Sequence, residues 1–468
     1  MYARHTKVVA TLGPSTDPPG RLDELIAAGL NCARLNCSHG TPDDLRRRAR
    51  EVREAAERCG RPIGLLFDLQ GPKLRLAADT ETRSLAVDDT VVFCGDSAAP
   101  EDRVVVDFAG FAALVTERSE IVIGDGVPRL SVDRVHEGEV VARVRSAGPL
   151  SARKGINVTW ARPELPAITE KDVDDLALAA ELGADFVALS FVRSASDLEQ
   201  LRARLLAHGS EARIVAKIEK VEAYEHLDEI IAVSDGVMVA RGDYGVEAGV
   251  AHVPLMQKDT IYRATQAGKL VITATQMLES MIQAPEPTRA EAADVANAVI
   301  DGTSAVMLSA ETSVGAYPVG AVRAMAEIAT AAERAPEIHG RAQSTDGETP
   351  AGAVMRAAVG LADDVDAVAL IVPTSTGGAA RACAKYRRPR PIIALAYDQR
   401  AANQLTLEWG VHPVAVEVAE TVDEMIDAAL VAARDDAGLP SGARVIVTAG
   451  RQTGTPGGTN LIMVREIP

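Results

Sequence analysis

Short apolar, β-branched runs recur through the first two thirds of the chain, and segments with helical spacing separate most of them. After Thr169, apolar residues fall at i, i+3, i+4 and i+7 (Val173, Leu176, Ala177 and Ala180), as on one face of an amphipathic helix. Eight runs are predicted to be strands: Lys7–Leu12, Asn31–Asn36, Ile63–Leu69, Phe186–Phe191, Arg213–Ile218, Gly236–Ala240, Leu270–Ala274 and Ala305–Leu308. Eight strands that alternate with helices predict a (β/α)8 barrel of the α/β class.

This alternation is interrupted between about Gly71 and Asn157, where the pattern is strand-like and rich in turns. We therefore expect a small all-β domain inserted after the third barrel strand. Beyond a polar stretch, βα alternation resumes, and it predicts an open parallel sheet with strands at Val368–Val372, Ile392–Leu395, Val414–Val416 and Arg444–Thr448. The expected domains are a barrel of residues 1–71 and 158–337, an inserted β-barrel lid of 72–157, and a C-terminal α/β domain of 338–468, suited to effector binding and oligomerisation.

Charge and composition limit the partners of this protein. The chain has 468 residues, with 49 Lys and Arg against 66 Asp and Glu, which gives a formal net charge of −17. Such a charge argues against nucleic acid and acidic membrane surfaces as partners, and any anionic substrate must be held by local cations. No apolar run reaches the ~20 residues of a membrane span. Five cysteines without CxxC spacing favour a reducing cytoplasm over a disulfide scaffold or a zinc site.

Chemically active side chains gather where the predicted strands end, and catalytic groups of such barrels lie at that face. Glu219 and Asp243 suit Mg²⁺, which binds one or two carboxylates and keeps water and substrate oxygens in its shell. Phosphoryl transfer depends on electrostatic positioning by cations. Any one of these residues could be a solvated rim charge, but six strand ends carry such groups: Arg34, Asn36, Ser38 and His39; Asp68, Gln70, Lys73 and Arg75; Lys217 and Glu219; Arg241 and Asp243; Thr275 and Gln276; Ser309 and Glu311.

The chain as a whole resembles the pyruvate kinase family. The matching strings include KVVATLGP, ARLNCSHG, DLQGPKLR, RKGIN, IVAKIEK, VARGDYGVE, ITATQMLESMI, PTRAEAADVANAV and VMLSAETSVGAYP, in this order. The resemblance implies transfer of the phosphoryl group from phosphoenolpyruvate to ADP, giving pyruvate and ATP, the last step of glycolysis. It also implies Mg²⁺ or Mn²⁺ as cofactor, a second divalent ion that arrives with ADP, and a β domain that closes as a lid.

Residue roles follow from the same resemblance. Arg34 matches the arginine that holds the substrate phosphate, and Lys217 matches the lysine that stabilises the phosphoryl group in flight. Glu219 and Asp243 match the protein ligands of the divalent cation. The backbone N–H groups of Gly242 and Asp243 are expected to face the substrate carboxylate.

The remaining site residues concern the proton and the nucleotide. Thr275 matches the threonine beside the enolate carbon, and Ser309 and Glu311 match a hydroxyl and an acid that relay its proton. Nucleotide phosphates are expected beside Arg75 and Lys154. His39 either helps to hold the nucleotide or is a packed imidazole that bonds its own loop.

The monovalent-cation positions depart from the potassium-dependent pattern of the family. Asn36, Ser38, Asp68 and the carbonyl of Leu69 match the family's cation-binding positions. The DLQGPK string, however, has Leu, Gln and Lys where that pattern has Thr, Lys and Glu, and the potassium-independent branch carries Leu, Gln and Lys. The ammonium of Lys73 is a fixed charge in place of the ion, so we expect that K⁺ is not required.

Regulation is expected in the C-terminal domain. The loop Thr374-Ser375-Thr376-Gly377-Gly378 follows a predicted strand and precedes a helix, a geometry in which backbone N–H groups and hydroxyls cradle phosphate. It matches the family's effector loop, although an ordinary βα turn has the same form. The Gly-rich segment Thr455–Thr459 could close over such an effector. The resemblance also implies a homotetramer.

Two other classes of protein compete with this interpretation. A lyase that uses the enolate of pyruvate would share the magnesium carboxylates but needs no ADP site, and Arg75, Lys154 and the inserted β domain count against it. A non-catalytic metabolite sensor would be expected to lack Lys217, Glu219, Asp243 or Thr275, all of which are present.

Overall fold

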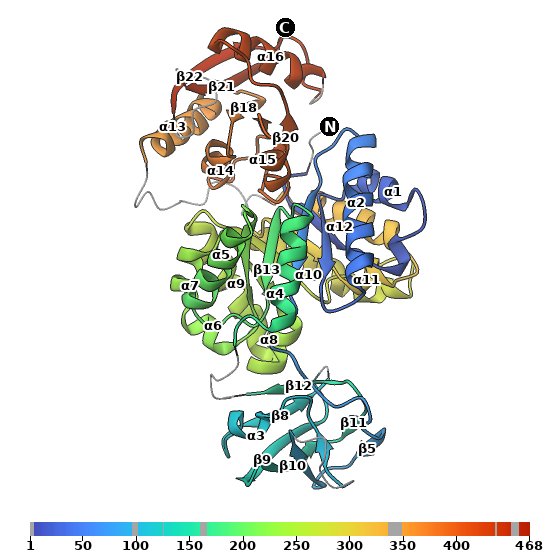
Figure 1. Ribbon diagram of the computed structural model, residues 1–468. Helices are drawn as coiled ribbons and strands as arrows, with labels where there is room; N and C mark the ends of the chain where they lie inside the picture. The colour runs from blue at the N-terminus through green and yellow to red at the C-terminus, as the bar shows by residue number, and fades with distance from the viewer. Residues whose placement is uncertain are drawn as a thin grey trace.

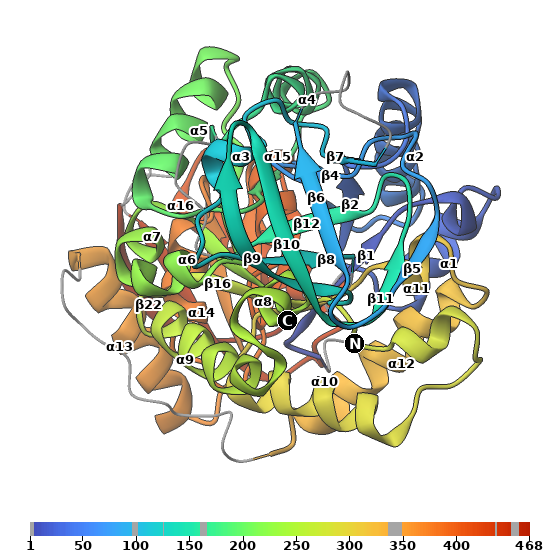
Figure 2. The same cartoon turned by 90° about the horizontal axis from the view of Figure 1, so that it is seen from below.

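The computed structural model describes residues 4–95, 102–124, 126–159, 166–335, 349–435, 438–450 and 458–468. Three bodies follow one another along a long axis, with the barrel in the middle, the β domain at one end and the C-terminal domain at the other (Figure 1). Figure 2 looks along that axis and shows the β domain in front of the barrel, within the outline of the barrel helices.

Eight parallel strands form a closed barrel in the order β1-β17-β16-β15-β14-β13-β3-β2, which confirms the predicted fold. Buried apolar side chains fill its interior, among them Leu66, Phe186 and Met238, so the barrel is a packed core and not a channel. The strands are β1 (Lys7–Thr11), β2 (Cys32–Asn36), β3 (Gly64–Asp68), β13 (Phe186–Leu189), β14 (Arg213–Ile218), β15 (Gly236–Ala240), β16 (Leu270–Ala274) and β17 (Ala305–Leu308).

Helices surround this barrel, and several begin where the sequence supplies a cap. Thr41, Thr169 and Thr288 each form a capping box with an acidic residue three positions later, which satisfies backbone N–H groups at the helix start. The helices are α1 (Arg21–Ala28), α2 (Pro42–Arg58), α4 (Glu170–Glu181), α5 (Ala195–Ala207), α6 (Val221–Glu225), α7 (Leu227–Val233), α8 (Arg241–Ala248), α9 (Val253–Gln266), α10 (Arg289–Asp301), α11 (Ala310–Ser313) and α12 (Pro318–Ala332). Short 3-10 turns lie at Pro14–Thr16, Val250–His252 and Glu279–Ile282.

The β domain interrupts the barrel between β3 and β13. Its main sheet has the order β4-β12-β8-β9-β10-β6-β7, and a bridge between Leu76 and Val106 joins the two edges of that sheet. A separate apolar core, with Phe93 and Phe111 fully buried, lies within it. Its elements are β4 (Leu74–Arg75), β5 (Arg83–Leu85), β6 (Thr90–Cys94), β7 (Val104–Val105), α3 (Phe111–Leu114), β8 (Glu120–Ile123), β9 (Arg129–His136), β10 (Glu139–Ser146), β11 (Gly148–Leu150) and β12 (Gly155–Val158).

The C-terminal domain has a five-stranded sheet in the order β20-β19-β18-β21-β22. Four strands are parallel, as predicted, but the edge strand β22 runs antiparallel to β21, which the sequence analysis did not foresee. The elements are α13 (Pro350–Asp364), β18 (Ala369–Thr374), α14 (Gly378–Ala384), β19 (Ile392–Ala396), α15 (Gln399–Gln404), β20 (Val411–Ala415), α16 (Val422–Asp435), β21 (Arg444–Gly450) and β22 (Thr459–Glu466).

Two expectations about this domain need comment. The predicted strand Val414–Val416 starts too late, because β20 already begins at Val411 and includes Pro413, which a strand at the edge of a sheet tolerates. The expected domain boundary at 337/338 lies outside the described residues, as does most of the Thr455–Thr459 segment.

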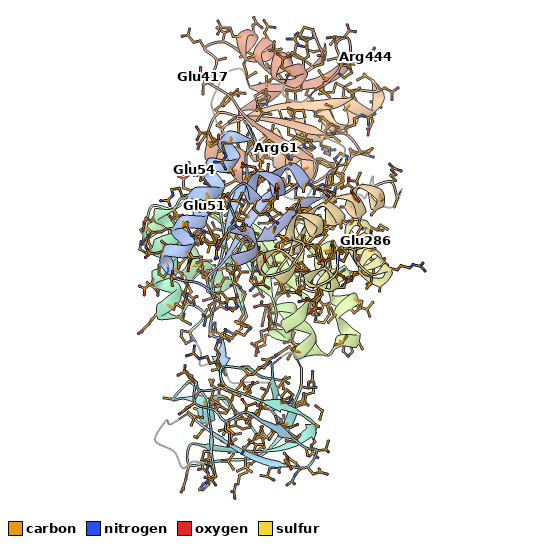
Figure 3. The ribbon with its side chains drawn as sticks, turned by 90° about the vertical axis from the view of Figure 1, so that its right-hand side faces the viewer. Glu51, Glu54, Arg61, Glu286, Glu417 and Arg444 are labelled. Atoms are coloured by element: carbon orange, nitrogen blue, oxygen red, sulfur yellow. The ribbon has the colours of Figure 1, made fainter. Side chains whose placement is uncertain are left out.

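Buried polar contacts join the floor of the barrel to the C-terminal domain. Within the barrel, both carboxylate oxygens of Glu333, directly after α12, accept hydrogen bonds from the backbone N–H of His5 and so hold this part of the floor. The Nζ atom of Lys7 donates to the carbonyl of Val411 over 2.6 Å, and the ring of His5 stacks on Trp409. Figure 3 shows Arg61 near this junction, at the opposite end of the barrel from the β domain.

Candidate active site

A cavity of about 920 Å³ lies between the C-terminal mouth of the barrel and the β domain. The β domain and the segment leading into it contribute the cations Lys73, Arg75 and Lys154 to its wall. Barrel strand ends and the helices after them contribute the polar groups Arg241, Gly242, Asp243, Thr275, Gln276, Ser309 and Glu311. The site therefore spans two domains, with cations on both sides and with the carboxylates and hydroxyls named above on the barrel side.

A buried network of charges lies beside this cavity. The ammonium of Lys217 is 3.1 Å from Oδ1 of Asp68 and 3.0 Å from Oε1 of Glu219. It also donates to the hydroxyl of Ser190 over 2.6 Å. On the other side of Asp68, Nε of Arg34 donates to Oδ2 over 2.7 Å. The two cations that the sequence analysis assigned to the phosphate therefore share one carboxylate.

The pKa values of this network follow from its geometry. Burial alone would raise the pKa of the Asp68 carboxyl, but Lys217 and Arg34 outweigh it and hold that pKa below its usual value. Burial also opposes the charge on Lys217, yet the carboxylates of Asp68 and Glu219 raise the pKa of that ammonium. Lys217 thus carries a positive charge at neutral pH without solvent around it.

Glu219 and Asp243 are the two carboxylates suited to a divalent cation. Burial, followed by the nearby Asp243 carboxylate, raises the pKa of Glu219, so the pair is electrostatically unfavourable on its own. A bound Mg²⁺ would relieve this repulsion, and Mg²⁺ needs only one or two protein carboxylates. No group of three or more potential metal ligands occurs among the described residues.

Thr275 occupies a left-handed backbone conformation directly after β16. Its φ is 68° and that of Gln276 is 53°, which is rare for a β-branched residue and typical of strain at functional sites. The guanidinium of Arg241 donates to the carbonyl of Thr275 over 2.6 Å and is itself held by Asp294 at 2.7 Å. These contacts present the Thr275 hydroxyl at the cavity wall.

The N–H of Gly242, which is expected to face the substrate carboxylate, donates to the hydroxyl of Thr275 over 2.9 Å. A substrate carboxylate would have to take this hydrogen from Thr275, whose hydroxyl also donates to the carbonyl of Ala274.

Ser309 and Glu311 both line the cavity at the end of β17. The buried carboxylate of Glu311 accepts hydrogen bonds from the backbone N–H of Ser309 at 2.6 Å and of Leu278 at 3.1 Å. Glu311 therefore ties the loop after β16 to the end of β17, a structural role that the sequence did not reveal.

His39 lies near the cavity but not in its wall. Burial and the neighbouring cations Arg75, Arg34 and Lys73 lower the pKa of its imidazole. His39 is therefore a neutral group close to the cations expected to bind nucleotide phosphate.

The four oxygen-bearing positions matched to a monovalent cation are largely occupied by protein contacts. The side-chain carbonyl of Asn36 accepts from the N–H of Ser38 at 3.1 Å, and the carbonyl of Leu69 accepts from the Ser190 hydroxyl at 2.6 Å. Asp68 bonds Arg34 and Lys217, as described above. The structure places Lys73 in the cavity wall, close enough to His39 to affect its pKa.

The loop matched to an effector site lies in the C-terminal domain, at the opposite end of the molecule from the β domain (Figure 1). Thr374 ends β18, and its hydroxyl accepts from the N–H of Gly377 at 2.9 Å. Gly377 has φ 80°, and Nη2 of Arg381 donates to the carbonyl of Thr376 over 2.7 Å.

Some residues of the site were missed in the sequence. Ser190 directly follows β13, so the strand-end argument could have found it. The contact between Arg241 and Asp294 carries no local signal, because the two residues lie on different helices.

Comparison with known proteins finds matches along nearly the whole chain. A family model described as "Pyruvate kinase, barrel domain" matches residues 3–322, and one described as "Pyruvate kinase, alpha/beta domain" matches residues 352–465. The chain is 40% identical to a pyruvate kinase of Geobacillus stearothermophilus, covering 99% of this chain and 80% of that protein. It is also 40% identical to a pyruvate kinase of Mycobacterium tuberculosis, covering 99% and 98%, and 39% identical to one of Mycobacterium intracellulare, covering 99% of each.

Within the described ranges, no helix is long and apolar enough to cross a membrane. The family models cover both the barrel and the C-terminal domain, and the relatives match along nearly the whole length. The chain therefore belongs to the pyruvate kinase family of phosphotransferases.

Proposed function

We propose that the cavity transfers the phosphoryl group of phosphoenolpyruvate to ADP, using the residues around Lys217. The observation that carries this assignment is the buried ammonium of Lys217, which lies between the carboxylates of Asp68 and Glu219. Arg34 also bonds the carboxylate of Asp68. In the reaction, the bond between phosphorus and the enol oxygen breaks and a bond to an oxygen of the ADP β-phosphate forms. Lys217 and Arg34 offset the negative charge on the phosphoryl oxygens during this transfer.

Glu219 and Asp243 would hold Mg²⁺ or Mn²⁺, and a bound ion supplies Lewis-acid stabilisation of the enolate that leaves. Thr275 lies beside the carbon that must then be protonated to give pyruvate, and we assign it to that step. Ser309 and Glu311, at the next strand end, complete the route of the proton through water. Both line the same cavity.

Arg75 and Lys154 bind the phosphates of the nucleotide from the β-domain side, and neutral His39 offers an uncharged hydrogen-bonding group nearby. The nucleotide would carry a second divalent ion, which would offset charge on its phosphates. Residues 72–157 act as a lid that excludes water during transfer, residues 1–71 and 158–337 form the catalytic barrel, and residues 338–468 serve regulation and assembly.

The first test measures the overall reaction in the wild-type protein and in a variant of Lys217. Wild-type protein should form pyruvate and ATP from phosphoenolpyruvate and ADP in a coupled assay. Lys217→Met should lower this rate by ~10²–10³ or more, because one preorganised electrostatic contact to the transition state is lost. Exchange of methyl protons of pyruvate with solvent, which needs the metal and the proton route but no phosphoryl transfer, should survive better. Equal loss of both activities would instead indicate a disrupted site.

A second prediction concerns the metal. Glu219→Gln and Asp243→Asn should each raise the Mg²⁺ concentration needed for half-maximal activity steeply, because a neutral amide is a weaker ligand than a carboxylate. Thermal unfolding should show that both variants remain folded. A variant that titrates with Mg²⁺ like wild type would exclude that residue as a ligand.

We further propose that the reaction does not require potassium. In this proposal the ammonium of Lys73 takes the place of K⁺ near Asn36, Ser38 and Asp68. Two like charges ~4 Å apart repel by about 1 kcal/mol in bulk water and by several times more where solvent is partly excluded. The side-chain carbonyl of Asn36 and the carboxylate of Asp68 are, in addition, already engaged within the protein.

The test compares activity in tetramethylammonium chloride with activity in KCl at equal ionic strength. The two rates should agree closely, and a tenfold activation by K⁺ would contradict the proposal. Lys73→Glu should make activity depend on added K⁺, because it removes the fixed positive charge and leaves a carboxylate to be neutralised.

We also propose that a phosphorylated effector, such as AMP or a sugar phosphate, binds the loop Thr374–Gly378 of a homotetramer. We propose a cytoplasmic location, which the five free cysteines support. Subunit contacts would couple the active sites and give sigmoidal dependence on phosphoenolpyruvate.

Replacing Thr374, Ser375 and Thr376 together by Ala should weaken activation by such effectors without changing the maximal rate. The measurement is the phosphoenolpyruvate concentration at half-saturation, with and without effector. Undiminished activation in this variant would move the effector site elsewhere.

A further inference from the structure

A second polar network joins the β domain to the barrel near the metal carboxylates, and its members are Asn157, Lys220 and Glu247. The side-chain oxygen of Asn157, on β12, accepts from Nζ of Lys220 at 2.9 Å. Its side-chain nitrogen donates to Oε2 of Glu247 over 2.9 Å. The ammonium of Lys220 is 3.0 Å from the same oxygen of Glu247, so the three groups form a closed triangle of contacts.

This triangle is partly shielded from water. The side chain of Glu247 is 7% exposed and that of Lys220 is 18% exposed. An amide satisfies both ends of such an ion pair at once, because it offers an acceptor to the ammonium and a donor to the carboxylate. An apolar residue at position 157 would leave both charges without this partner, and a carboxylate there would repel Glu247.

Both barrel members of the triangle lie next to a proposed metal ligand. Lys220 directly follows Glu219 at the start of α6. Glu247 lies on α8, four residues after Asp243, and residues at that spacing share one face of a helix. A second contact from the β domain reaches the same helix, where Nη2 of Arg129 donates to the carbonyl of Val246 over 3.3 Å.

The N-terminal end of α8 belongs to the candidate active site. It carries Asp243, and the N–H of Gly242 donates to the Thr275 hydroxyl. Asp243 lies near one end of the helix and the contacts to the β domain lie near the other, about one turn apart. The base of the β domain is therefore attached to the same helix that carries Asp243.

From this arrangement we propose that Asn157, Lys220 and Glu247 are positioning residues that fix the base of the β domain against α8 and so align the nucleotide cations with the metal carboxylates. The inference rests on the proposed function. It explains how the β-domain side and the barrel side of the site keep a fixed relative position. Arg75 and Lys154, the cations on the β-domain side, flank β12 in the structure: Arg75 pairs with Gly155 across β4 and β12, and Lys154 directly precedes that strand.

The proposal predicts that losing the triangle affects the nucleotide more than phosphoenolpyruvate. In Asn157→Leu, which keeps the approximate size of the side chain but removes both hydrogen bonds, KM for ADP should rise about tenfold and kcat should fall. Hydrogen bonds to charged groups are typically worth that much. KM for phosphoenolpyruvate should change less than twofold, because its expected partners, Arg34 and Lys217, lie within the barrel.

Two further measurements separate positioning from general destabilisation. Pyruvate proton exchange, which needs no nucleotide, should stay within twofold of wild type. Amide hydrogen exchange at residues 153–158 should become faster in the ligand-free variant, which reports a loosened base of the β domain directly. The matched control is Arg143→Ala, which removes an exposed ion pair with Asp133 inside the β domain and touches no barrel residue in the contacts described. It should leave all of these quantities unchanged.

A double-mutant cycle completes the test. If Asn157 acts through Glu247, then Asn157→Leu combined with Glu247→Gln should raise KM for ADP no more than the larger single change does, because contacting residues are not additive. Additive effects, equal rises in KM for ADP and phosphoenolpyruvate, or unchanged hydrogen exchange would each overturn the proposal. Failure of the proposed function would be distinct, since wild type itself would then form no ATP in the same assay.

Discussion

The compensation of charge around Lys217 is the constraint on which the barrel mouth depends. An ammonium removed from water is costly unless carboxylates lie against it, and here Asp68 and Glu219 do so at 3.1 and 3.0 Å. Asp68 in turn bonds Arg34, so the position of either cation fixes that of the other. Under the proposed function, a phosphate entering this site would meet two cations whose spacing was set during folding, so little reorganisation would be needed when charge moves.

The same principle of fixed geometry explains the strain at the end of β16. A threonine with φ 68° is unfavourable by itself, and the structure retains it because Arg241 and Asp294 hold the adjoining carbonyl. Glu311 adds a second tie through the N–H of Leu278. The loop after β16 is therefore held by Arg241 and Glu311, whose side chains bond backbone groups, and by Asp294, which holds Arg241.

The sequence predicted strands and site residues correctly where the pattern that identifies them lies within a short stretch of the chain. Barrel strands could be located because each is a short apolar run, and the strand-end rule located the Lys217 network because strand ends converge in any such barrel. Edge strand β22 was missed, because its residues are half exposed and share no strong alternation. Asn157 was missed as a contact residue because its partner Glu247 is distant in the chain, and only the docking of two domains brings them together.

The place of the inserted domain has a consequence for how the chain reaches its native state. β3 and β13 pair in register, with Leu66 opposite Phe186, although the whole β domain separates them in the chain. Bringing the ends of so long a flexible loop together would lower chain entropy considerably. The insertion, however, has its own apolar core, and its entry strand β4 pairs with its exit strand β12. Once that domain has folded, its two ends are already neighbours. We therefore expect the domain to form before the barrel closes and to lower the entropy cost of pairing β3 with β13.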